Sequence, residues 1–335
     1  PVRELSVAQQ QMVEIARAVQ RPRPGDVPLR LLILDEPTSS LTQVDVERLF
    51  AVVDRLKENG VSILYISHFL EECEQVADRF TVLRDGLSIG SGNIKTTPVA
   101  DIIRMMVGRD VSELYPEFQR TLGETILEAQ EVSGVRRPRD VTFRIRRGEI
   151  FGLAGLVGGG RTETARALFG LDRMARGHVC IGGRDAGERS PPASWHRDNI
   201  GIVSEDRKDE GLLLTRSVVE NLTITGTRRY RGMYMLNQRK MRDATRRWME
   251  KLDVRASGPD QPAAELSGGN QQKVAIGRLL HHDCDILRLD DPTRGIDIGS
   301  KATIYRAISE LAGSGKAILL ISSYLPELLG ICDTI

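Results

Sequence analysis

A glycine-rich segment, Gly155-Leu-Val-Gly-Gly-Gly-Arg-Thr162, is the part of this sequence best suited to hold a phosphate group. It fits the pattern GxxxxGK(S/T) with Arg161 in place of the lysine, and it stands between an apolar run and a helical pattern. Glycines let successive backbone N–H groups turn inward, and the following helix adds its positive N-terminus. The segment therefore predicts a phosphate cradle with Thr162 as a candidate Mg²⁺ ligand. Its glycines are Gly155, Gly158, Gly159 and Gly160.

Two aspartates, Asp35 and Asp290, each follow a short apolar run. A carboxylate at the end of a buried strand can hold Mg²⁺ directly or through water. Glu36 stands where it could orient and polarise an attacking water as a general base, and His68 follows the next apolar run, where it could reach a γ-phosphate. The alternative is that these carboxylates only cap helices or shape turns.

A third candidate is Ser267-Gly268-Gly269, which precedes a helical pattern over residues 271–280. Small residues and free N–H groups at the start of a helix suit a phosphate that arrives from outside the domain. The alternative is an ordinary capped helix start.

An internal repeat organises the chain, because three blocks recur in the same order at nearly constant spacing. The first block recurs after 261 residues and the other two after 255. A polar, Pro/Gly-rich stretch at residues 21–28 reads as a loop insertion that absorbs the difference. The blocks are Leu5-Ser-Val-Ala-Gln-Gln-Gln11 and Leu266-Ser-Gly-Gly-Asn-Gln-Gln272, Leu34-Asp-Glu-Pro-Thr38 and Leu289-Asp-Asp-Pro-Thr293, and Ile66-Ser-His68 and Ile321-Ser-Ser323.

The elements around the repeat predict an α/β fold with a mainly parallel sheet and covering helices, because strand, helix and strand follow one another in both copies. The glycine-rich segment precedes only the second copy, and the second copy stops just after Asp333, which matches Asp78, whereas the first copy continues beyond Asp78; we therefore expect both ends of the chain to be incomplete. The predicted division is residues 1–107 as the C-terminal part of a first domain, 108–124 as a junction and 125–335 as a second domain. Strands are predicted at residues 31–34, 61–66, 150–154, 286–289 and 317–321.

Composition narrows the classes of partner. Lys and Arg total 47 against 46 Asp and Glu, a formal charge of +1, which gives no general attraction for nucleic acid or anionic lipid. A basic cluster at residues 136–139 is interpreted as a solvated face. The four cysteines form no CxxC pair, and the apolar runs are strand-sized, far below the roughly 18 residues that span a bilayer.

Taken together, the glycine loop, the Leu-Ser-Gly-Gly block, the Asp-Glu strand end and the Ser-His pair resemble ATP-binding cassettes. Further segments resemble the second cassette of the tandem ATPase subunits that drive ribose, galactose and xylose import, and residues 105–116 resemble the junction between cassettes in that family. These segments are Val203-Ser-Glu-Asp-Arg-Lys208, Asp290-Asp-Pro-Thr-Arg-Gly-Ile-Asp297 and Ser322-Ser-Tyr-Leu-Pro-Glu327.

The resemblance implies a P-loop NTPase fold with additional antiparallel β and helical subdomains, ATP and Mg²⁺ as cofactors, and two ATP sites shared between head-to-tail cassettes. In each site the phosphate loop and carboxylates come from one cassette and the Leu-Ser block comes from the other. One site would use Asp35, Glu36 and His68 with Ser267, Gly268, Gly269 and Gln271. The other would use Gly155–Thr162, Glu205, Asp290, Asp291 and Ser323 with Ser6.

The second of these sites is expected to bind nucleotide without hydrolysing it. Arg161 replaces a compact ammonium with a broad planar fork. Asp291 is one methylene shorter than glutamate, and a displacement of about 1 Å can cost roughly a hundredfold in rate. Ser323 has no imidazole, and Glu205 places an acid where cassettes usually carry glutamine. We expect no measurable ATP turnover from this chain by itself.

The resemblance also implies partners and a location. These are an integral-membrane sugar permease, expected as a dimer and contacted by a helical subdomain over residues 211–265, and indirectly an extracytoplasmic sugar-binding protein. The protein would lie peripherally on the cytoplasmic face of the membrane and bind no nucleic acid. Two alternatives stay open: a soluble tandem ATPase that acts on ribosomes or DNA, and a non-hydrolytic nucleotide-binding module.

Overall fold

The computed structural model of this chain describes residues 2, 5, 7–19, 29–38, 41, 43–67, 69–84, 86–108, 115, 120–155, 158–187, 190–206, 210–232, 235–294, 296 and 298–335. They form two compact units, unit 1 over Pro1–Val111 and unit 2 over Ser112–Ile335. Two residues that the sequence analysis singled out, Ser6 and His68, lie outside the described residues. The assignment of the two units to a first and a second cassette remains a prediction.

Unit 1 contains two pairs of strands among its described residues. Strand β1 (Leu31–Asp35) pairs in parallel with β2 (Ser62–Ile66), and β3 (Arg79–Arg84) pairs antiparallel with β4 (Leu87–Asn93). The helices among its described residues are α1 (Val7–Val19), α2 (Gln43–Glu58), α3 (Leu70–Val76) and α4 (Val99–Val107). The core forms where apolar side chains on one face of β1 pack against α1 and α2.

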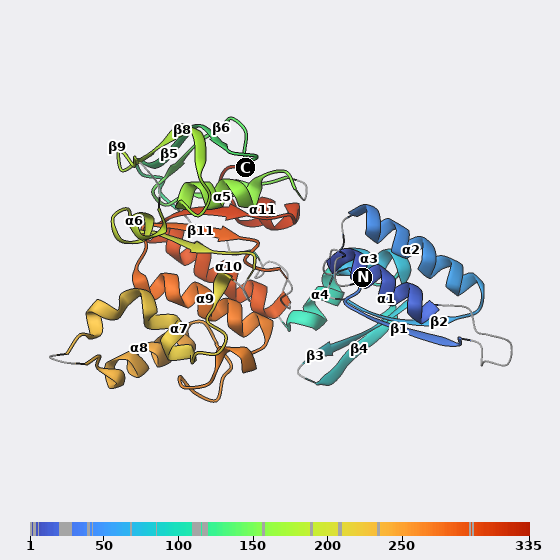
Figure 1. Cartoon of the computed structure of the whole chain (residues 1–335). Helices are drawn as coiled ribbons and strands as arrows, with labels where there is room; N and C mark the ends of the chain where they lie inside the picture. Colours follow the sequence, from blue (N-terminus) through green and yellow to red (C-terminus); the bar gives the residue numbers. More distant parts are fainter. Residues whose placement is uncertain are drawn as a thin grey trace. The chain divides into compact units, whose positions relative to one another are not determined.

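Unit 2 is built on a parallel sheet in the order β10-β11-β12-β7. Figure 1 labels strand β11 of this sheet. Its strands are β7 (Ile150–Leu153), β10 (Ile200–Val203), β11 (Ile286–Asp290) and β12 (Ala317–Ile321). A second, antiparallel sheet has the order β6-β5-β8-β9. Its strands are β5 (Thr125–Gly134), β6 (Val141–Arg146), β8 (Met174–Ile181) and β9 (Arg184–Asp185).

Both faces of the central strands β11 and β12 are covered, so every residue in them is buried. Side chains on one face, including Leu319, pack against the antiparallel sheet and helix α5 (Arg161–Phe169). Side chains on the opposite face, including Leu320, pack against α9 (Gly268–His282) and α10 (Ile298–Gly313). This two-sided burial explains why the two strands do not alternate between apolar and polar residues: β12 is a continuous apolar run, and β11 is interrupted by Arg288, which is itself buried.

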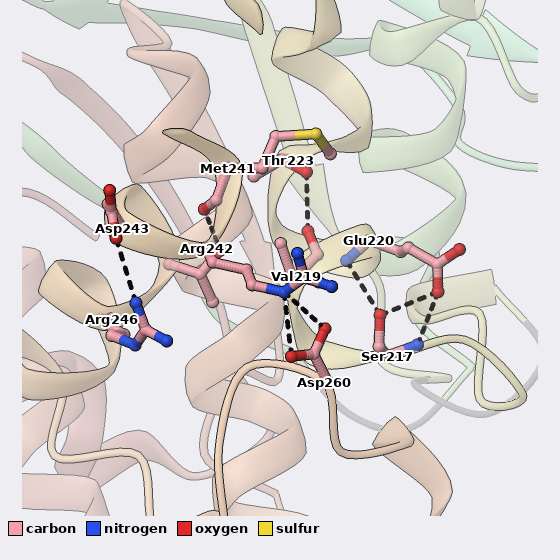
Figure 2. A network of polar contacts seen from close by, with 10 residues as sticks. Ser217, Val219, Glu220, Thr223, Met241, Arg242, Asp243, Arg246 and Asp260 are labelled. Carbon is pink, nitrogen blue, oxygen red and sulfur yellow. Dashed lines mark hydrogen bonds and ion pairs between the residues drawn. The ribbon is translucent and has the colours of Figure 1, made fainter. Parts of the chain in front are cut away.

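The segment 211–265 is largely helical, in agreement with the sequence analysis. It contains α7 (Val218–Thr223), the 3₁₀ segments η4 (Ile224–Tyr230) and η5 (Ala263–Glu265), and α8 (Gln238–Lys251). Figure 2 shows the contacts that fix its helices. Ser217 and Glu220 form a capping box at the start of α7, and the Arg242 Nε lies 2.9 Å and 3.0 Å from the two carboxylate oxygens of Asp260. Helix α6 (Pro191–His196) and α11 (Leu325–Ile331) complete unit 2.

The predicted α/β class and parallel pairing are confirmed, and the predicted strands differ from the observed ones by at most one residue at an end. Among the described residues no helix combines the length and the apolar character needed to cross a bilayer.

Candidate functional site

The glycine-rich segment of unit 2 joins the end of β7 to the start of α5, the strand-loop-helix context that its pattern predicts. Gly158 (φ 78°) and Gly160 (φ 99°) have left-handed backbone conformations, which a Cβ would disfavour. Gly160 is the N-cap of α5 and supplies no side chain to the first turn of the helix. A loop of this kind can present backbone N–H groups and a helix N-terminus to an anion.

Asp290 ends β11 beside Thr162 in the first turn of α5. Its side chain is 2% exposed and hydrogen-bonded to the Thr162 side chain, while its Oδ1 has no hydrogen-bond partner among the described residues. Burial raises the pKa of the Asp290 carboxyl to about 6, and the hydrogen bond to Thr162 partly opposes this shift. A buried carboxylate with one open oxygen beside a hydroxyl is a donor pair suited to a hard cation.

Three residues that depart from the predicted cassette pattern, Arg161, Asp291 and Ser323, lie together at the ends of β11 and β12. Asp291 has a left-handed backbone (φ 41°), and its Oδ1 accepts hydrogen bonds from the Ser323 backbone N–H at 3.0 Å and the Ser323 hydroxyl at 3.4 Å. The Arg161 guanidinium donates to the Ser322 backbone carbonyl at 2.8 Å. Both Asp291 and Arg161 are thus engaged by the segment that follows β12.

Glu205 follows β10 and forms an ion pair with Arg294, which lies in the segment after β11. Burial lowers the pKa of Arg294, and the nearby positive charge of Arg161 lowers it further. Glu205 is therefore part of a mixed-charge cluster at the carboxyl end of the parallel sheet, in which Arg294 offsets its charge.

A cavity of about 420 Å³ opens beside the glycine loop. Arg137 and Arg139 line it together with Arg161, and the described residues that line it include no acid. A Cβ placed on Gly158 would lie 3.5 Å from the Arg137 Nη1, so this guanidinium lies directly over the loop. The cavity is therefore positively charged on the side that faces the glycine loop.

Sequence reasoning missed this role for Arg137 and Arg139, which it placed on a solvated face. Both side chains are indeed exposed, but they also line the cavity. The available signal was the density of three arginines within four residues about 20 positions ahead of the glycine loop. Only the packing of the β5–β6 connection beside α5 brings them to the loop.

Unit 1 carries the strand-end pair Asp35 and Glu36. The Glu36 backbone is left-handed (φ 46°), as at Asp291, and its N–H donates to the Ile66 carbonyl at 2.9 Å. Gln11 of α1 donates from its side-chain amide to the Pro37 carbonyl at 2.7 Å, which ties this helix to the turn after β1.

The Leu-Ser block of unit 2 forms the start of α9. Ser267 is the N-cap of this helix, but its hydroxyl caps no backbone N–H and instead accepts a hydrogen bond from the Asn270 side chain at 2.9 Å. Gly268 and Gly269 form its first turn. The Gln271 side chain is buried and donates to the Ala263 carbonyl at 3.0 Å, so its amide is engaged within unit 2.

Comparison with known proteins points to one family. A family described as ABC transporter matches residues 138–294. The ribose import ATP-binding protein RbsA of Geobacillus kaustophilus is 43% identical over 331 residues, which is 99% of this chain and 66% of that protein. The putative ribose/galactose/methyl galactoside import ATP-binding protein 2 of Burkholderia cenocepacia is 46% identical, over 98% of this chain and 63% of that protein. The chain thus spans slightly less than two thirds of the length of these curated relatives.

Solved structures agree on the fold. A nucleotide-free ATP-binding cassette from an ABC transporter matches with a TM-score of 0.54 at 22% identity, over 63% of this chain and 86% of that one. A dimeric, post-hydrolysis ATP-binding cassette bound to ADP and Pi matches with a TM-score of 0.53 at 21% identity, over 60% of this chain and 89% of that one.

Proposed function

Since this chain belongs to the ABC transporter family of ATP-binding cassettes, we propose that it is the ATP-binding part of a bacterial importer for ribose, galactose or a related monosaccharide. Relatives named as import ATP-binding proteins, at 40% to 46% identity over nearly the whole chain, support the sugar class. The observation that carries nucleotide binding is the open, buried Asp290 oxygen beside Thr162 at the glycine loop.

These residues fit a magnesium-bound triphosphate. The described residues contain no cluster of three or more His, Cys, Asp or Glu side chains able to hold a metal. A site completed by Asp290, Thr162, phosphate oxygens and water is the arrangement that Mg²⁺ usually adopts in such enzymes. When bound, Mg²⁺ would offset the charge of the phosphates.

The chain's own groups have separate tasks in this proposal. The backbone N–H groups of the glycine loop and the Arg161, Arg137 and Arg139 guanidiniums bind phosphate. In unit 1, Glu36 orients and polarises the attacking water and His68 contacts the γ-phosphate, with Asp35 near the metal. The Leu-Ser blocks, at Ser6 and at Ser267 to Gly269, contact a nucleotide held by another cassette.

Unit 2 is proposed to bind nucleotide without turning it over. Asp291 is held by Ser323, which offers a hydroxyl in place of an imidazole, and it has one methylene too few to reach as far as a glutamate. Glu205, paired with Arg294, would lie near the phosphates as an acid where an amide is usual.

The helical segment 211–265 is the proposed contact surface for an integral-membrane sugar permease. Its connection between η4 and α8 presents Met235, whose side chain is 82% exposed, followed by Leu236. Exposed apolar residues on a helical projection are typical of a protein contact. The partner is expected to be a permease dimer that receives sugar from an extracytoplasmic binding protein, which places this protein peripherally at the cytoplasmic face of the membrane.

The alternative of an ATPase acting on ribosomes or DNA is less well supported, because the relatives compared are named for import and the formal charge of +1 offers no attraction for a polyanion. Uptake of labelled ribose and galactose by vesicles that contain the permease and the complete ATP-binding protein would test the proposal. ATP-dependent uptake is the expected result. Co-sedimentation with ribosomes and no association with permease vesicles would overturn it.

A direct binding experiment tests the ATP assignment. We expect this chain to bind a fluorescent ATP analogue in the presence of Mg²⁺, and we expect phosphate release to stay at background. Turnover that depended on Glu36 would contradict the second expectation, and absence of Mg²⁺-dependent binding would contradict the first.

A further inference from the structure

A glutamate that accepts hydrogen bonds from a threonine and a serine recurs in both units, half-buried in unit 1 and buried in unit 2, and it has no role in either site described above. In unit 1 the Glu72 carboxylate accepts hydrogen bonds from the Thr38 hydroxyl at 2.6 Å and the Ser67 hydroxyl at 3.0 Å. In unit 2 the Glu327 carboxylate accepts hydrogen bonds from the Thr293 hydroxyl at 2.7 Å and the Ser322 hydroxyl at 2.5 Å.

The threonine and serine contacts of the two networks are equivalent, while Glu72 has one further donor, the Tyr65 hydroxyl at 2.8 Å, where unit 2 has Leu320. All three residues of the second network stand 255 residues after those of the first, the spacing of the repeated strand-end blocks. In both, the threonine donates to Oε1 and the serine to Oε2. The serine hydroxyl in turn accepts from the backbone N–H two residues later, Phe69 at 3.0 Å and Tyr324 at 3.1 Å. Its proton is therefore directed to the carboxylate, which only accepts.

Each glutamate joins two loops that carry proposed site residues. Thr293 stands two residues after Asp291, in the turn that follows β11, and Ser322 immediately precedes Ser323, after β12. Asp291 and Ser323 are hydrogen-bonded to each other, and the Ser322 carbonyl holds Arg161. In unit 1 the same spacing puts Thr38 two residues after Glu36 and Ser67 immediately before His68.

Capping the following helix does not explain this arrangement. Glu72 and Glu327 lie in the first turns of α3 and α11, where an acid is favourable, but neither helix has a side-chain cap. A dipole effect alone would leave the carboxylate exposed and would not require a threonine 34 residues away. Instead, Glu327 is 1% exposed, and Thr293 and Ser322 are equally buried. Burying a carboxylate is costly unless it is satisfied by donors, and here both oxygens are.

We propose that Glu72 and Glu327 are positioning residues of the two nucleotide sites. Each fixes the turn after the strand-end acid against the loop after the next strand, and so sets where Glu36 and His68, or Asp291 and Ser323, can lie relative to a bound phosphate. This inference rests on the proposed nucleotide-binding function.

The test compares Glu327→Ala and Glu327→Gln with Glu310→Ala, an exposed glutamate of α10, in the whole chain. The affinity for a fluorescent ATP analogue and the deuterium exchange of amides 322–324 are both measured, because the Ser323 N–H is held by Asp291. We expect Glu327→Ala to weaken binding roughly tenfold, the loss given by about one charge-assisted hydrogen bond. Exchange at 322–324 should rise with the amides of β12 unchanged. Glu327→Gln, which keeps one acceptor and the shape, should recover part of both losses.

A merely structural role gives a different result. The urea midpoint would then fall while the folded variant kept wild-type affinity and wild-type exchange at 322–324, and this outcome would overturn the proposal. If Glu327→Ala does not fold, Thr293→Val and Ser322→Ala each remove one donor. Their combined loss of affinity should be smaller than the product of the single losses, because both act through one carboxylate. A combined loss of affinity equal to the product of the single losses would contradict the proposal.

Failure of the proposed function can be told apart from failure of this inference. A wild-type chain that binds no nucleotide would refute the function, while the exchange at 322–324 in Glu327→Ala would still decide whether the glutamate positions the loop. In unit 1, Glu72→Ala should likewise raise exchange at amides 66–69, with Glu71→Ala as the control.

Discussion

The same pair of parallel strands occurs in both units, but both of its faces are buried in unit 2 and one face is exposed in unit 1. In unit 2 the pair β11–β12 lies between β10 and β7 and is buried on both faces. In unit 1 the pair β1–β2 has no further strand beside it among the described residues, and every second side chain is exposed. Leu64 is 51% exposed, while its counterpart Leu319 is fully buried.

The comparison shows that the strand sequences require more than the strands themselves. An apolar run in a parallel sheet is stable when both of its faces are covered. Unit 1 buries one face of its strand pair under α1 and α2. Unit 2 buries both faces of its own strand pair, one of them under α5 and the antiparallel sheet. The turn after each strand is nevertheless the same in both units, since Glu36 and Asp291 share a left-handed backbone and a hydrogen bond to the next strand.

The largest expected difference is in stability. Leu319→Ala should lower the free energy of unfolding of unit 2 by about 3 kcal/mol, because it leaves a cavity in a fully covered face. Leu64→Ala should cost less than about 1 kcal/mol, since half of that side chain already faces solvent. Urea unfolding measures both. Tryptophan fluorescence reports unit 2, which holds Trp195 and Trp248, and far-UV circular dichroism reports both units. Equal losses would contradict the comparison.

The raised pKa of Asp290 predicts that the stability of unit 2 depends on pH. Its pKa is raised from 3.8 to about 6, so between about pH 4 and pH 6 the folded state binds more protons than the unfolded state. Stability is therefore highest below this window and falls by roughly 2–3 kcal/mol as the pH rises through it. Asp290→Asn should remove this slope, raise the urea midpoint at pH 8 and abolish Mg²⁺-dependent nucleotide binding. Asp243→Asn, an exposed aspartate, is the control, and an unchanged slope in Asp290→Asn would refute the assignment.

A substitution at Gly269 tests the difference between the two Leu-Ser blocks. A Cβ at this position would lie 2.9 Å from the Ile296 Cγ2 and 3.1 Å from the Ser300 hydroxyl, whereas the first block has Ala8 at the equivalent place. Gly269→Ala should therefore destabilise unit 2 by about 1–3 kcal/mol through overpacking. Gly313→Ala meets nothing within 4 Å and should be neutral or stabilising by up to about 1 kcal/mol. Thermal unfolding of the two variants measures both effects. A Gly269→Ala variant as stable as the wild type would show that packing does not require glycine at this position.

The smallest expected effect concerns the arginines of the cavity, which belong to unit 2. Arg137→Ala should weaken the binding of ATP and of tripolyphosphate by about fivefold, the loss of one solvent-screened phosphate contact. Arg136→Ala, which does not line the cavity, is the control. Titration calorimetry with both ligands checks this. A loss for ATP alone would place Arg137 against the nucleoside, and no loss for either ligand would remove it from the site.

The fold and part of the site could be predicted because their signals are local in the sequence. The apolar runs gave the strands to within one residue, and the glycine spacing gave the loop between β7 and α5. The repeat of 255 residues paired the strand ends Asp35 and Asp290. It also contains Glu72 and Glu327, but it does not indicate their contacts, because a glutamate near a helix start has an ordinary explanation.

Other features depended on contacts between distant segments. Arg137 reaches the glycine loop only because the β5–β6 connection packs beside α5. The Gln271 side-chain amide, which the resemblance places near a phosphate, donates a hydrogen bond to the Ala263 carbonyl. The sequence shows which residues are polar, but the packing determines which partner each of them contacts.

The strands and helices along the chain, the glycine loop and the acids that follow the strands can be predicted from the residues alone, since each depends on neighbours within a few positions. The packing of distant segments sets which of these groups are buried, which are held by a partner and which remain open. Burial raises the pKa of Asp290, and burial makes Glu327 depend on the Thr293 and Ser322 hydroxyls as donors; the burial of each carboxylate is set by everything packed around it.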